Sequence, residues 1–144
     1  MKTPTERRTA GQYASVEVQT GVTEASPHRL IQMLLDGALG KIAQARGLML
    51  RRQIAGKGNA VTSACSIIMG LRSSLDLEAG GELAANLDRL YDYMFRRLMD
   101  AHVQNDVAAL DEVASLLHEV KRGWDALPQE TTAGGEVVRS MTGA

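Results

Sequence analysis

The side chains best suited to chemistry are three histidines and a single cysteine. His28, His102 and His118 fall on three separate predicted helices. No glutamate stands three residues before a histidine, as the ligand pairs of di-iron helical bundles require. We therefore expect the histidines to be surface or boundary residues. Cys65 has no cysteine to pair with, so an internal disulfide is excluded. We expect it to be a small buried hydrophobic side chain rather than a nucleophile.

Two short segments imitate ligand sites. Gly56-Lys57-Gly58 suggests a phosphate loop, but no predicted strand precedes it and the full glycine spacing is absent. Asp76, Glu78 and Glu82 surround the Gly80-Gly81 turn and could be imagined as a metal or acid–base cluster. We favour turn and helix-cap chemistry for these acids. The sequence thus predicts no catalytic residue, no metal and no cofactor.

The composition favours a single domain that stays in the cytoplasm. A chain of 144 residues is one domain by length. A net charge of −1, with both signs interspersed, gives no electrostatic reason to bind nucleic acid or a membrane surface. The first eleven residues are polar and do not resemble a signal peptide. No apolar run approaches the roughly 20 residues of a membrane span.

Apolar residues at helical spacing predict four helices. Ser26 and Pro27 mark the start of the first, which should end between residues 51 and 53. The others are expected over about 59–75, 81–104 and 107–127. Short connections favour an antiparallel four-helix bundle over residues 26–127. We expect a flexible segment over residues 1–25 and a disordered tail over 128–144. The predicted seam of the third helix is Leu83, Leu87, Leu90, Met94, Leu98 and Ala101.

Three of the five aromatic residues lie within five positions of the third predicted helix: Tyr91, Tyr93 and Phe95. Because positions one and two apart do not share a helix face, these side chains must point in different directions. In one interpretation Tyr91 is in the core and Tyr93 is half-buried with its hydroxyl in water. In the other, the helix has two apolar faces, one for its own bundle and one for a partner.

The stripes of methionine and aliphatic side chains suggest a surface function. If the apolar stripe exceeds what one core needs, the excess forms a groove for an amphipathic helix. The alternatives are that every stripe is core, or that the groove is buried in a homodimer of an adaptor or scaffold protein. A monomer or a weak homodimer is expected.

Three segments resemble the FliS-type flagellar export chaperones. TEASPHRLIQMLLDGAL (residues 23–39) is similar to the family pattern T-A-S-P-x-x-L-I-x-M-L-Y-D-G-A-L, with an extra Glu24 and with Leu35 in place of Tyr. SLDLEAGGELAANLDRLYDYM (residues 74–94) matches S-L-D-x-E-x-G-G-x-I-A-x-N-L-x-x-L-Y-x-Y-M. The third is Asn105-Asp106 with the helix that ends at Trp124. The resemblance extends from Tyr13 to about residue 127.

The resemblance implies a helical bundle without catalysis that binds the disordered C-terminal region of flagellin. Such a chaperone prevents premature polymerisation and assists delivery to the export machinery, whose components are further possible partners. The resemblance also implies that the segment around Tyr13 covers part of the groove in the free protein. We predict that the groove lies between the second and third helices and is lined by Ile67, Ile68, Leu71, Leu75, Leu87, Tyr91, Tyr93 and Met94.

Overall fold

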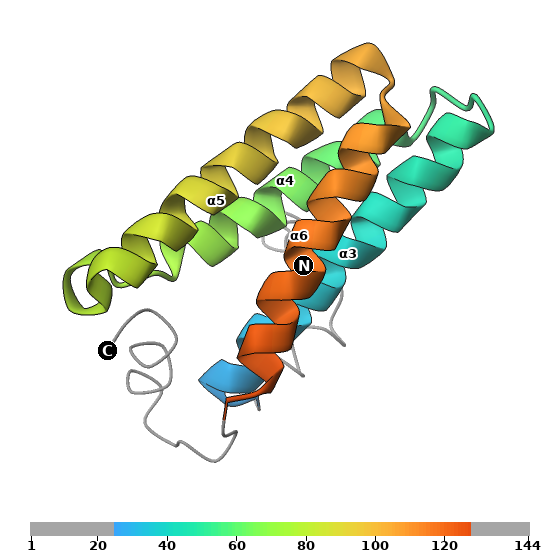
Figure 1. The fold of residues 1–144 in the computed structure, drawn as a ribbon. Coiled ribbons are helices and arrows are strands. Elements are labelled where there is room, and N and C mark those ends of the chain that lie inside the picture. The colour runs from blue at the N-terminus through green and yellow to red at the C-terminus, as the bar shows by residue number, and fades with distance from the viewer. Residues whose placement is uncertain (1–24, 128–144) are drawn as a thin grey trace, which may run out of the picture.

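Four helices form an antiparallel bundle in the computed structural model, which describes residues 25–127 (Figure 1). They are α3 (Pro27–Leu50), α4 (Lys57–Ser73), α5 (Leu77–Gln104) and α6 (Val107–Asp125). Each helix packs mainly on the next in the chain, and α6 returns to pack on α3. The predicted fold class is confirmed. The expectations for residues 1–24 and 128–144, and for Tyr13, lie outside the described residues.

Polar caps start three of the helices. The side chain of Ser26 accepts a hydrogen bond from the backbone N–H of Arg29 at 3.1 Å, and Pro27 follows as the first helical residue. The carboxylates of Asp76 and Asp106 cap α5 and α6 in the same way. These bonds satisfy amide groups that have no partner within the helix. The Asp76 bond confirms the interpretation of that carboxylate as a cap.

Helix α5 begins earlier than the sequence suggested, because an extra turn precedes its main body. The turn Leu77–Gly80 is followed by Gly81 with φ 56° and ψ −135°, a conformation outside the helical region. Positive φ costs glycine little, since it has no Cβ. Gly81 therefore kinks the helix between its first turn and its main body. Of the Gly80-Gly81 pair, only Gly81 has a positive φ.

The core seam of α5 differs from the prediction at two positions. Leu83 is 41% exposed and Leu90 is half-buried, whereas Ala84 and Tyr91 are buried. The stripes through 83 and 90 and through 84 and 91 are adjacent on a helix, so a periodic pattern satisfies both. Packing favours the second because it places the ring of Tyr91 in the core, while Ala84 fits closely near the kink. Leu87, Met94, Leu98 and Ala101 are buried as predicted.

The prediction that all three histidines are surface or boundary residues is wrong for His28, which is only 2% exposed. Its ring stacks on Trp124 of α6, with the centroids 5.1 Å apart. His28 Nε2 lies 3.1 Å from the carbonyl oxygen of Trp124, and Trp124 Nε1 donates to the carbonyl oxygen of His28 at 2.9 Å. This reciprocal pair closes one end of the core.

Candidate partner-binding surface

The predicted groove residues divide into a buried and a half-buried set. The side chains with almost no exposure are Ile68, Leu71, Leu87, Tyr91 and Met94, which all belong to the hydrophobic core. Burial raises the pKa of Tyr91 to about 12, because the phenolate would be poorly solvated there. The half-buried ones are Ile67, Leu75 and Tyr93. In this conformation, only the half-buried set is open to direct contact with a partner.

The half-buried residues do not line a single groove. Ile67 faces α3, since a Cβ added to Gly37 would lie 3.4 Å from its Cδ1 atom. Tyr93 faces α6, where its hydroxyl donates a hydrogen bond of 2.5 Å to Glu112. One of the two interpretations of this helix placed the Tyr93 hydroxyl in water, but it has a protein partner. The three aromatics nevertheless separate as expected, with Tyr91 in the core and Tyr93 half-buried.

Glu112 of α6 is held by two donors from α5. Arg97 Nε donates to it at 2.8 Å, beside the bond from Tyr93. The bonds from Tyr93 and then Arg97 lower the pKa of Glu112 below its usual value. The same bond to Glu112 raises the pKa of Tyr93, because its neutral form donates the hydrogen. The α5–α6 boundary is thus closed by polar contacts.

Where α4 and α5 meet at the surface, methionine side chains are exposed instead. Met69 of α4 and Met99 of α5 are each 38% exposed. Met99 Sδ lies 3.8 Å from Cys65 Sγ, which places it beside α4. Methionine is flexible and polarizable, and it adapts to partners of varied shape. Val103, one turn beyond Met99, is also exposed. These residues leave apolar area outside the core.

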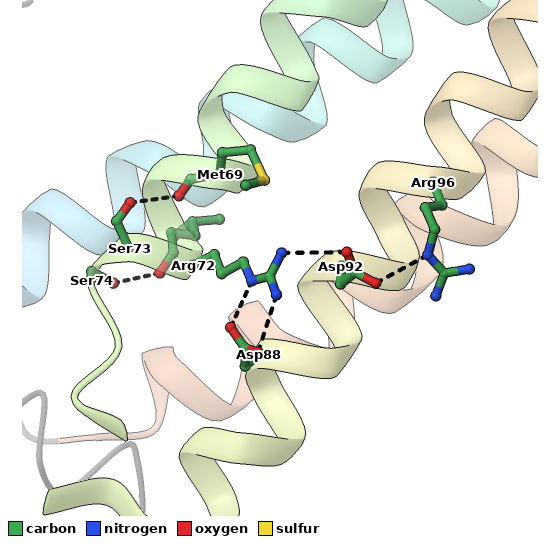
Figure 2. A network of polar contacts seen from close by, with 8 residues as sticks. Met69, Arg72, Ser73, Ser74, Asp88, Asp92 and Arg96 are labelled. Carbon is green, nitrogen blue, oxygen red and sulfur yellow. Dashed lines mark hydrogen bonds and ion pairs between the residues drawn. The ribbon is translucent and has the colours of Figure 1, made fainter. Parts of the chain in front are cut away.

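A network of charges continues this boundary toward the α4–α5 turn (Figure 2). Arg72 of α4 donates to both carboxylate oxygens of Asp88, at 2.6 and 3.2 Å, and to Asp92 at 3.3 Å. Arg96 donates to Asp92 from the other side at 3.0 Å. The bonds from Arg72 lower the pKa of Asp88 below its usual value. We call the surface formed by Met69, Arg72, Asp88, Asp92, Arg96 and Met99 the α4–α5 face.

The charged character of the α4–α5 face was not predicted from the sequence. Asp88, Asp92 and Arg96 stand four residues apart, which places them on one side of a helix. That spacing was available as a signal, but the pairing with Arg72 on another helix was not.

The described residues contain no obvious chemical centre. Residues 25–127 include no group of three or more His, Cys, Asp or Glu side chains that could hold a metal ion. Cys65 is buried, and the loss of solvation raises its pKa to about 11, so its thiol stays protonated near neutral pH. Across this same part of the chain, every helix is too short or too polar to cross a membrane.

The chain is similar to proteins of a known family. Residues 9–131 match the family described as "Flagellar protein FliS". The flagellar secretion chaperone FliSB of Pseudomonas aeruginosa is 55% identical over 116 residues, which cover 81% of this chain and 92% of the relative. The flagellar secretion chaperone FliS of Salmonella typhimurium is 46% identical over 113 residues, 78% of this chain and 84% of that protein. The FliS of Vibrio cholerae is 40% identical over 118 residues, covering 82% and 87%.

Proposed function

Because the chain belongs to the FliS family of flagellar proteins, we propose that it is a cytoplasmic export chaperone that binds the disordered C-terminal region of flagellin. By holding that region, it prevents premature polymerisation and assists delivery of flagellin to the flagellar type III export machinery. The family match over residues 9–131 carries this proposal, since the named relatives are flagellar secretion chaperones. Components of the export machinery are its further partners.

The α4–α5 face is the surface that we assign to flagellin. It combines two half-exposed methionines with a line of charges, so it offers both adaptable apolar contact and polar anchors. An amphipathic helix could place its apolar side on Met69 and Met99 and its polar edge on Arg96. Arg96 pairs with Asp92 and lies over the ring of Tyr93, 5.9 Å from its centroid, but its side chain is well exposed, so it can also reach a carboxylate of the client.

The predicted groove residues take two roles in this proposal. Ile68, Leu71, Leu87, Tyr91 and Met94 support the face from the core beneath it. Ile67, Leu75 and Tyr93, which are half-buried, meet parts of the client that wrap beyond the face. We also propose that the segment around Tyr13 covers part of the face when no client is bound.

Binding alone, without a reaction, accounts for this function. A disordered client can wrap a large surface, and the conformational entropy it loses lowers its affinity for a given contact area. The complex therefore stays reversible, as a cargo that must be released requires. The proposal needs no catalytic residue, cofactor, metal ion or nucleic acid.

Titration calorimetry of the full chain against the C-terminal segment of flagellin from the same cell tests the proposal. We expect one-to-one binding with a dissociation constant of about 1 μM or lower. A large negative heat-capacity change should accompany it, because the client folds onto apolar surface. Met69→Glu and Met99→Glu should each weaken binding by about tenfold or more, since a carboxylate would be desolvated at the interface.

Ile54→Asp is the matched control, because it also places an acid at an exposed apolar position but at the α3–α4 turn. It should leave flagellin affinity unchanged. Absence of heat at several temperatures, with both proteins folded, would refute the flagellin proposal. A mass that rises with concentration in light scattering would then favour the homodimeric scaffold or adaptor instead.

A further inference from the structure

A depression lies at the α3–α4 turn, at the end of the bundle far from residues 25 and 127 (Figure 1). Its volume is about 500 Å³, and its walls include Leu50, Arg52, Ile54, Lys57 and Asn105. Ile54 is 79% exposed, the largest value among the exposed large hydrophobic side chains of residues 25–127. Leu50 is also exposed. Two aliphatic side chains thus stand in water at the rim of a concave surface.

The backbone at this rim is held in a conformation that suits glycine better than arginine. Arg52 has φ 57°. Its N–H donates to the carbonyl of Met49 at 3.0 Å, and the N–H of Gln53 donates to that of Leu48 at 2.9 Å. This is the helix-ending motif in which glycine usually occupies the left-handed position. An arginine in this position retains backbone strain, which often accompanies a role in binding.

The charge of the rim is positive. Residues 51–58 contain Arg51, Arg52 and Lys57 and no acid. Lys57 is only 8% exposed, and its ammonium group donates to the carbonyl of His102 at 3.3 Å and to Asn105 Oδ1 at 2.9 Å. The lysine therefore serves to fix the end of α5. Arg52 lines the depression and forms no ion pair within residues 25–127, so its charge remains available. Arg51 does not line the depression, since its guanidinium lies beside Gly47 of α3.

We propose that this depression is a second docking surface, which binds an acidic amphipathic helix of another protein. Aliphatic anchors of the partner meet Leu50 and Ile54, and one of its carboxylates pairs with the guanidinium group of Arg52, which lines the depression. Both ends of the described chain lie at the opposite end of the bundle, across the ~36 Å length of α3 (Figure 1). The surface is distinct from the α4–α5 face, so a partner and flagellin can bind together.

The test uses the full chain and a fluorescein-labelled synthetic peptide helix, with leucines on one face and glutamates beside them. A peptide with lysine in place of each glutamate is its control. Fluorescence anisotropy should show tighter binding of the acidic peptide by about tenfold or more, and this preference should shrink as salt screens the charges. Equal binding of the two peptides, or no binding of the acidic one, would overturn the proposal.

Three variants locate the binding. Ile54→Asp should weaken binding of the acidic peptide by about tenfold or more. Leu77→Asp, which alters a side chain that is 55% exposed at the other end of the bundle, should not change it. Arg52→Gly should also weaken binding of the acidic peptide. The melting temperature of this variant protein should rise by about 4 °C, because the backbone strain is relieved. Weaker binding by a more stable protein cannot come from unfolding.

The proposal fails if Leu77→Asp weakens binding of the acidic peptide as much as Ile54→Asp does, because binding would then be non-specific. It also fails if Ile54→Asp removes flagellin binding, since the depression would then be part of the client surface. The flagellin proposal has its own readout in calorimetry with Met69→Glu and Met99→Glu. The two ideas can therefore succeed or fail separately.

Discussion

Helices α3 and α6 meet around buried polar groups, whereas the polar groups between α4 and α5 are only half-buried. At the first contact, His28 and Trp124 exchange hydrogen bonds while both rings are almost completely buried. At the second, the polar bonds from Arg72 to Asp88 and Asp92 lie on the outside, beside the half-exposed Met69 and Met99. Buried polar groups are costly unless they are paired, so the first contact permits one arrangement. The second has more freedom, which suits a surface that must accept and release a client.

The largest effect should follow from breaking the buried contact between His28 of α3 and Trp124 of α6. Trp124→Ala removes a buried indole and leaves the carbonyl of His28 without its donor, so the free energy of unfolding should fall by about 4 kcal/mol. Met99→Ala, at the contact between α4 and α5, should lower the free energy of unfolding by about 0.5 kcal/mol or less. Urea unfolding followed by circular dichroism measures both. Similar losses in the two variants would remove the distinction between the contacts.

A second prediction sharpens the comparison within a single helix. Leu71 and Met69 are two positions apart on α4, but Leu71 is in the core and Met69 is on the α4–α5 face. Leu71→Ala should lower the free energy of unfolding by about 3 kcal/mol, and Met69→Ala by about 0.5 kcal/mol. Flagellin affinity should change in the opposite order, falling several-fold only for Met69→Ala. A loss of affinity in folded Leu71→Ala would instead support direct contact by Leu71.

The smallest predicted effect is on the stability of the fold at low pH. Asp88 has a lowered pKa in the folded protein because Arg72 donates to it. A carboxylate whose pKa is lower in the folded than in the unfolded state stabilises the fold at pH values above its unfolded pKa. This contribution is lost as the pH falls through the lowered value. Asp88→Asn should therefore be less stable than the natural chain at neutral pH, and the difference should shrink below about pH 4.

Urea unfolding at neutral pH and at about pH 3 measures the difference. Glu82→Gln is the control, because Glu82 is an exposed carboxylate of α5 without an ion pair among residues 25–127. It should be nearly as stable as the natural chain at both pH values. A difference for Asp88→Asn that does not vary with pH would show that the Arg72 bonds contribute nothing to acid stability.

Local sequence signals predicted the helices well. Ser26-Pro27 and Asp106 mark helix starts through bonds to residues only three positions away, so their effect can be read directly. The seam of α5 was harder, because Leu83 and Ala84 both fit a helical period and packing with other helices decides between them. The start of α4 at Lys57 rather than near residue 59 has a similar cause, since Lys57 is fixed by His102 and Asn105.

The candidate surface was harder to predict, because it is formed by contacts between residues that are distant in the sequence. Nothing near His28 in the chain shows that it is buried, because its partner Trp124 lies 96 positions away. The pairing of Arg72 with Asp88 likewise needs the turn between α4 and α5 to bring them together. The resemblance to the FliS family indicated a binding role, but it could not separate core side chains such as Met94 from exposed ones such as Met99.

The pairing of His28 with Trp124 also has a consequence for synthesis. Three of the four main helix contacts join neighbours in sequence, and such local contacts form quickly. The fourth joins the first described helix to the last, so it requires α6 to have left the ribosome. Until then α3, α4 and α5 must exist as a three-sided assembly with its core open on one side. The growing chain therefore carries exposed apolar surface until α6 has emerged, and it gains its full cooperativity only when α6 packs on α3.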